Sequence, residues 1–586
     1  MNESQLAELI SKEPTEVLEE LVHRLGQVYS ESPGMLVQRI SNILAVLEKA
    51  SWPELSEPDF ARFTRILIQA ATMSPSALPL VFRVVLEEAA SRRTTRCECL
   101  IEQLLKFVPA SVPVLVTSLE FYFPHHSRPQ EQIFNYSEML TCLLRMAPIL
   151  RSRIINMMID KFLTIDVAIQ LEATNLPDAL ELAEEEETDS EESTVKLPET
   201  QPEVMEEYEV MDSDLLRRAS SPIALNMVEM MGKLDSSLAL LFEFLKSCQS
   251  EEIKAIFSHL LQTFEKTILP TFRSRSVPFL IFYASSLDSS LPDVFLGFLM
   301  KRLYHVFDDP ADGRKKSSAS TASLLTVLTA SYIGSYVSRA RFLPESLVRL
   351  SFDMLLTWSL RFIGDLPNHM KSGRGVKALR VGTNLISERV AVFYAVSQAI
   401  MYILCFRHKI LIQDAPNRHE ALTNYRNFIL PILQSSLNPL KWCMSAVVEE
   451  FVRLSEFYNL IDCRQIIEKS SRRSAPPAQT SQSSEMISEE AFGPRVTDKT
   501  GSFLGDLDSY FPFDPLILTS CSSFITPEIY LGWQAVQEEI DAEEPEETES
   551  SDTDGDEPSG DVTNIIHKEL LQCNPAWQAL AIRKLV

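Results

Sequence analysis

The residues that could do chemistry in this 586-residue sequence are few and poorly clustered. Cys97 and Cys99 are the only closely spaced cysteines, and Cys405 stands near His408, whereas a structural zinc site needs four ligands. The run Gly373–Ala378 reads G-x-G-x-x-A, but no strand pattern precedes it, so the dinucleotide-binding context is absent. No P-loop, nucleophile elbow or zinc-protease motif occurs. The sequence therefore predicts no catalytic, metal or cofactor site.

Carboxylates and thiols offer no catalytic pairing either. Glu449 and Glu450 lie in an amphipathic stretch and are expected on the solvated face of a helix. Nine cysteines are scattered through hydrophobic stretches, and Met1–Lys12 lacks the basic and apolar regions of a signal peptide. This usage is typical of reduced, buried thiols in a cytosolic or nuclear protein.

Four hydroxyl side chains stand in contexts that protein kinases recognise. These candidates are Ser220, Thr188, Ser551 and Thr553. Ser220 follows Arg217 and Arg218, as basophilic kinases require, and precedes Pro222 at an expected helix start, where a phosphate would meet free N–H groups. The alternative role of Ser220 is that of a helix N-cap. The other three precede a carboxylate by three residues, a spacing that acidic segments also contain by chance.

A basic run is the candidate for contact with DNA or with a partner. Its members are Lys371, Arg374, Lys377 and Arg380. Such a run can contact phosphates without reading sequence, and it can equally contact an acidic protein face. It has no interleaved aromatic residues of the kind that stack bases, so DNA contact through it would be weak.

The elements that must position these residues are helices. Glycine is scarce, at 16 of 586 residues, which disfavours hairpin-rich β folds and Gly-rich phosphate loops. Apolar residues recur with i, i+3, i+4, i+7 spacing, and prolines from Pro14 to Pro148 separate the stretches. Pairs of stretches repeat at intervals of roughly 40 residues. The pattern predicts an all-α fold, a HEAT-like α-solenoid, with an irregular helical domain as the alternative.

The charge is concentrated in two segments. The chain carries a net −27, of which residues 178–214 contribute −15 and residues 538–561 contribute −13. Segments with so many carboxylates and so few apolar residues are expected to be disordered, which predicts an acidic insert and an acidic C-terminal segment. The remaining body is close to neutral.

These patterns divide the chain into seven parts. They are N-terminal helical repeats (1–177), the acidic disordered insert (178–214), C-terminal helical repeats (215–469), a disordered linker (470–500), an aromatic segment (501–537), an acidic disordered segment (538–562) and a C-terminal helix (563–586). The aromatic segment contains the docking candidates Tyr510, Phe511, Phe513 and Trp533. It either docks on the body as the C-terminal cap of the repeat stack or docks on a partner.

One stretch requires a comparison with membrane spans. Val390–Phe406 contains no charged residue. The length of this stretch is near the short limit for a helix that crosses a bilayer. Ser397 and Gln398 lie in its middle, and a helix that is apolar on all sides is also typical of a buried layer. The expectation is a core helix, with no membrane association.

Several longer motifs, in order along the chain, resemble one family. They are Ser331–Pro344, Phe393–Arg407, Leu437–Cys443 with Val448–Phe451, and Ser509–Leu516 with Tyr530–Trp533 beyond. The family is that of RNA polymerase I-specific transcription initiation factors of TIF-IA type. The resemblance covers residues from about 110 to 533, and the first 100 residues match only as helices.

The resemblance implies a concrete function. Members are HEAT-repeat proteins without catalytic activity that bind the stalk region of RNA polymerase I and bridge it to promoter-bound core factor at ribosomal RNA genes. Such a protein acts in the nucleus and nucleolus, is tuned by phosphorylation and forms a homodimer when free. The competing interpretation is another α-solenoid adaptor, such as a nuclear transport protein or scaffold. An enzyme is disfavoured by the missing catalytic motifs.

The family also carries a phosphorylated serine patch in its N-terminal repeats. No motif places this patch residue by residue. The nearby serines are Ser111, Ser118, Ser127 and Ser137. For each of them a buried or capping role is the expected alternative.

Overall fold

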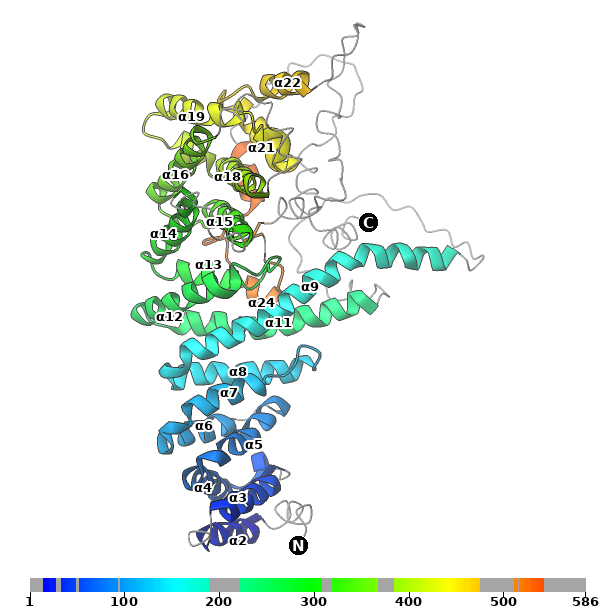
Figure 1. Cartoon of the computed structure of the whole chain (residues 1–586), viewed down its shortest axis with the longest axis vertical. Helices are drawn as coiled ribbons and strands as arrows, with labels where there is room; N and C mark the ends of the chain where they lie inside the picture. Colours follow the sequence, from blue (N-terminus) through cyan, green and yellow to red (C-terminus); the bar gives the residue numbers. More distant parts are fainter. Residues whose placement is uncertain are drawn as a thin grey trace, which may run out of the picture. The chain divides into compact units, whose positions relative to one another are not determined.

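A computed structural model describes the chain over residues 14–27, 33–48, 52–92, 95–188, 222–307, 319–366, 384–474, 511–514 and 516–541. These residues form helices and turns and no strand (Figure 1). One isolated antiparallel bridge joins Ala340 to Tyr530. The all-α prediction is therefore confirmed. Contacts divide the chain into two compact units: unit 1 is Met1–Ile169 with Asn226–Leu260, and unit 2 is Gln170–Leu225 with Leu261–Val586.

Unit 1 is built from helices whose starts the sequence encodes. The helices that lie wholly in it are α2 (Pro14–Gln27), α3 (Pro33–Glu48), α4 (Glu57–Met73), α5 (Leu78–Ser91), α6 (Thr95–Phe107), α7 (Val112–Phe121) and α8 (Gln130–Met146). Helices α9 (Arg151–Thr188), α11 (Pro222–Ser247) and α12 (Ser250–Thr263) belong to it in part. Proline is the first residue of α2 and α3, where its missing N–H costs no helical bond. Ser56 caps α4 by accepting a hydrogen bond from the Asp59 N–H.

One type of joint recurs along unit 1. A single 3₁₀ turn that begins with proline connects helices at Pro75–Ala77, Pro109–Ser111 and Pro148–Leu150. Each turn follows a helix and leads at once into the next, so the unit consists of helix–turn–helix pairs. Helices α6 and α7 bend by 114° across such a joint. This repetition agrees with the predicted HEAT-like organisation.

The predicted boundaries differ from this division in three places. Helix α9 continues to Thr188, so it includes the first residues assigned to the acidic insert. The run Asn226–Leu260 packs with the N-terminal helices, because Gln130 donates to the Gly232 carbonyl (3.1 Å) and Arg151 pairs with Glu252 (3.2 Å). Helix α22 (Cys463–Ser474) extends past the predicted end at 469. The rest of the insert and linker, and the C-terminal residues from 542 onward, lie outside the described residues.

Unit 2 packs its helices around two long ones. Its helices are α13 (Phe279–Ser286), α14 (Leu291–Tyr304), α15 (Ala319–Arg339), α16 (Glu345–Gly364), α18 (Asn384–His408), α19 (Arg418–Leu433), α20 (Pro439–Trp442), α21 (Ser445–Phe457), α22 (Cys463–Ser474), α24 (Thr519–Ser522) and α25 (Trp533–Asp541). Helices α15 and α18 lie side by side at the centre of the unit (Figure 1). They approach closely at Gly334, where an added Cβ would stand 2.8 Å from the Ala399 Cβ.

Helix α18 is the apolar stretch that the sequence singled out. The helical segment Arg389–Gln413 is long and apolar enough to cross a membrane, and 78% of its most apolar window is buried inside the protein. Gln398, one of the two polar residues in its middle, is buried, and its side chain accepts a hydrogen bond from the Met444 N–H at 2.9 Å. This burial supports the core interpretation.

The expectation for Glu450 is wrong. Glu450 is buried, with 4% of its side chain exposed, and it pairs with Arg453 at 2.8 Å. An amphipathic pattern assigns a carboxylate to solvent, but a cation one helical turn away compensates its burial here.

Candidate functional site

The structure describes three of the predicted contact residues in full. Phe511, Phe513 and Trp533 are buried, and Thr188 is the last residue of α9. The other candidates lie outside the described residues: Ser220, Ser551, Thr553, Lys371, Arg374, Lys377, Arg380 and Tyr510.

Residues 511–514 and 516–541, here called the docked segment, lie on helices α13, α15 and α18 of unit 2. Backbone hydrogen bonds hold it at the end of α15: the Arg341 N–H donates to the Ile529 carbonyl (3.0 Å), and the Leu531 N–H donates to the Arg339 carbonyl (2.8 Å). The Phe513 N–H donates to the Ser335 hydroxyl at 3.2 Å. The segment is thus bound through its main chain, as peptides bound by strand pairing are.

Aromatic side chains anchor the docked segment. The fully buried Phe513 ring lies among four rings, with centroids 5.1 to 6.0 Å away: Phe279, Phe282, Tyr332 and Tyr336. Phe511 stacks on Tyr402 at 4.3 Å, and Trp533 meets Phe406 at 5.0 Å. Each anchor of this kind buries about 150–250 Å². Burial of this area is the main force that holds the segment on unit 2.

A charged pair and a buried arginine accompany these rings. Asp514 of the segment accepts a hydrogen bond from Arg275 at 3.1 Å. Arg339 is 3% exposed, lies 4.3 Å from the Phe406 ring centroid and donates to the Leu531 carbonyl. Burial raises the pKa of Asp514, and the two arginines only partly offset it. The sequence pattern did not predict these charged contacts, although Asp514 lies in the motif Ser509–Leu516 and Arg339 in the motif Ser331–Pro344.

The place of docking differs from that of an end cap. A cap would lie beyond α22, the last helix of the described repeat stack, whereas the docked segment contacts α13, α15 and α18. The aromatic rings that receive the segment stand on these three helices, within unit 2.

The serines near the expected patch are mostly inaccessible. Ser111, Ser118 and Ser137 are buried, as the alternative interpretation predicted. Ser127 is exposed, and its hydroxyl lies 2.9 Å from Nδ1 of His125. Ser127 is therefore the accessible hydroxyl of these four.

Unit 1 exposes large apolar side chains at its helix ends. Phe107, Phe121 and Met146 are the last residues of α6, α7 and α8, and Ile149 follows in the next 3₁₀ turn. Phe121 is 78% exposed and Ile149 79% exposed.

The cysteine and histidine residues considered as metal ligands differ in burial. Cys97 is buried, whereas Cys99 is exposed, contrary to the expectation of core thiols. His408 is buried with Nδ1 at 2.8 Å from the Tyr458 hydroxyl, and Cys405 is buried beside it in α18. Among the residues that the structure describes, no group of three or more His, Cys, Asp or Glu side chains could hold a metal ion.

The described residues thus define an all-helical protein with recurring helix–turn–helix pairs. A family model described as RNA polymerase I specific transcription initiation factor RRN3 matches residues 10–538. The chain therefore belongs to this family of transcription initiation factors, as its motifs indicated.

Known relatives agree with this assignment. The chain is 27% identical over 527 residues to the RNA polymerase I-specific transcription initiation factor rrn3 of Schizosaccharomyces pombe, covering 87% of this chain and 79% of that protein. It is 28% identical over 450 residues to the mouse factor RRN3, covering 75% of this chain and 60% of that protein. A crystal structure of RNA polymerase I transcription initiation factor Rrn3 matches 91% of the chain with a TM-score of 0.61 and 20% identity, a likeness of fold.

Proposed function

We propose that this chain is a non-enzymatic initiation factor that binds RNA polymerase I and bridges it to promoter-bound core factor for ribosomal RNA synthesis in the nucleolus. The observation that carries the proposal is the family match, which extends from before α2 into α25 and so includes most of both units and of the docked segment. Helical-repeat folds suit this role, because stacked helices give a long, stiff contact surface.

The family resemblance assigns the contact to the stalk region of the polymerase. On this chain, the proposed contact surface is formed by the exposed helix ends of unit 1. Phe121 and Ile149 leave most of their apolar area in water, and contact residues of this size carry much of the energy of protein interfaces. The basic run 371–380 adds weak phosphate contact with promoter DNA, and the free factor forms a homodimer.

Phosphorylation is proposed to tune this association. Helix α11 begins at Pro222, so Ser220 lies two residues before a helix start, where the added charge would meet the positive end of the dipole. Thr188, Ser551 and Thr553 are the further proposed sites. Unequal polymerase affinities of Ser220→Ala and Ser220→Asp would support this role, and equal affinities with an unmodified Ser220 in cells would leave only capping.

Cosedimentation with purified RNA polymerase I tests the proposal. The chain is expected to move with polymerase I and not with RNA polymerase II. The double variant Phe121→Ala, Ile149→Ala should weaken the complex, while Val294→Ala, which removes a half-exposed apolar side chain from unit 2, should not. Absence of a complex with polymerase I would contradict the function, and an unaffected double variant would contradict the assigned surface.

A further inference from the structure

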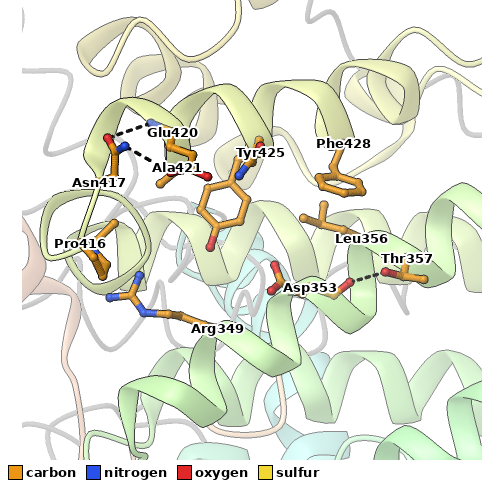
Figure 2. A pocket seen from close by; sticks show the side chains of 12 residues that line it. Arg349, Asp353, Leu356, Thr357, Pro416, Asn417, Glu420, Ala421, Tyr425 and Phe428 are labelled. Carbon is orange, nitrogen blue, oxygen red and sulfur yellow. Dashed lines mark hydrogen bonds between the residues drawn. The ribbon is translucent and has the colours of Figure 1, made fainter.

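A pocket of about 460 Å³ lies between helices α16 and α19 of unit 2, closed at one end by the turn at 414–417 (Figure 2). Helix α16 supplies Arg349, Asp353 and Leu356, and helix α19 supplies Tyr425 and Phe428. The docked segment packs instead on α13, α15 and α18. No role described above uses it.

Tyr425 is the polar group built into this pocket. It is 8% exposed, and its ring meets Phe352 edge-on at 5.2 Å, which fixes its direction. Figure 2 shows its hydroxyl group pointing into the pocket. Among the described residues this hydroxyl has no hydrogen-bond partner. Burial and the nearby Asp353 carboxylate raise the pKa of Tyr425 to about 12, so the phenol stays neutral and offers an oxygen acceptor.

The carboxylate of Asp353 stands beside this hydroxyl, with the guanidinium of Arg349 nearby but not paired with it. The Asp353 carboxylate makes no ion pair or hydrogen bond among the described residues. Arg349, one helical turn earlier, donates instead to Glu345 (3.4 Å) and to the Asp414 carbonyl (3.3 Å). Much of Asp353 is exposed, yet partial desolvation in the pocket raises the pKa of its carboxyl group despite Arg349. A cation placed in the pocket would relieve this cost.

Apolar surface borders the charged end of the pocket. Leu356 lines it, Phe428 at its edge is 43% exposed, and Leu350 on α16 is 56% exposed. A long basic side chain combines a cationic head with an apolar stem, and its neighbours along a peptide can cover further apolar area. A free small cation would leave Phe428 and Leu350 exposed to water.

We propose that the pocket binds a lysine or arginine side chain of a partner protein. The cationic head pairs with Asp353 and donates to the Tyr425 hydroxyl oxygen, and the stem lies against Leu356 and Phe428. An apolar residue next to it in the partner covers Leu350. The site is independent of the polymerase contact proposed for unit 1, so each can fail without the other.

Fluorescent octapeptides that differ at one central position, flanked by leucines, test this site on the full chain. By anisotropy, the Arg and Lys peptides should bind about tenfold more tightly than the Gln peptide, and the Glu peptide more weakly still. Asp353→Asn should abolish the preference for Arg over Gln, and Tyr425→Phe should reduce it. Asp365→Asn, the same change at the exposed end of α16, is the matched control and should bind as the unmodified chain does.

Four results would overturn the proposal. They are equal binding of the Arg and Gln peptides, no binding up to about 1 mM, an Asp353→Asn variant that keeps the preference, and arginine amide that binds as tightly as the Arg peptide. The last result would assign the pocket to a small molecule. Because Asp353 is largely exposed, thermal melting of its variant should match that of the Asp365→Asn control, which separates loss of binding from loss of fold.

Discussion

Phe513 anchors the docked segment, so Phe513→Ala tests whether this segment is part of the folded unit. The ring is fully buried, with the Phe282 and Tyr332 centroids at 5.1 and 5.6 Å. Removing a buried Phe ring costs about 3–5 kcal/mol. If the segment opens locally while the rest of unit 2 stays folded, this cost is the free energy that the docked state loses relative to the detached state. At a factor of ten per 1.4 kcal/mol, the detached state should gain at least on the order of 100-fold.

Hydrogen exchange of the full chain measures this directly. Amides within 511–541 should lose at least about 100-fold of their protection in Phe513→Ala, since their exchange reports detachment. Phe121→Ala is the matched control, because the same ring is removed from a side chain that is 78% exposed. Its effect should stay within about 0.5 kcal/mol. Unchanged protection of the segment in Phe513→Ala would refute the claim that this ring holds it in place.

Two further substitutions test the packing and the electrostatics. Gly334→Ala should destabilise unit 2 by about 1–3 kcal/mol in urea unfolding, because the added Cβ would meet Ala399. Gly297→Ala, with open space around the added Cβ, should be neutral or stabilising. Equal effects of the two substitutions would contradict the close contact between α15 and α18. The pKa of Asp59 is held low, chiefly by a hydrogen bond from Ser56, so its stabilisation is present above pH 3.8 and lost as the pH falls further. Asp59→Asn should therefore cost about 1–3 kcal/mol at pH 6 and progressively less as the pH falls below 3.8, and a pH-independent difference would contradict this linkage.

Local patterns predicted most of the helices. Proline at Pro14, Pro33 and Pro222 begins a helix in each case, because it lacks the N–H that the first turn leaves unpaired. The apolar run in α18 predicted a buried helix, because a helix that is apolar on all sides is typical of a buried layer. The length of α9 was underestimated, since the charge count favoured disorder over residues 178–188 while Glu, Ala and Leu are good helix formers.

The periodicity of apolar residues could not predict how side chains pack in the folded protein. The burial of Glu450 depends on Arg453 and on the packing of α21, and a hydrophobicity pattern assigns any carboxylate to solvent. The docking position of Phe513 depends on rings more than 170 residues earlier in the chain. The pocket at Asp353 and Tyr425 exists only because α16 and α19 pack side by side. Residue types predicted an aromatic anchor, but tertiary packing decides where it docks.

A reconstituted transcription assay on a ribosomal RNA promoter tests the central claim most directly. Purified RNA polymerase I and core factor from the same organism are combined with the promoter, with and without this chain. The proposed function predicts that specific transcripts depend on the added chain and that the Phe121→Ala, Ile149→Ala variant restores fewer of them. Transcripts at the same level without the chain, or none when the folded chain is present, would contradict its assignment as an initiation factor.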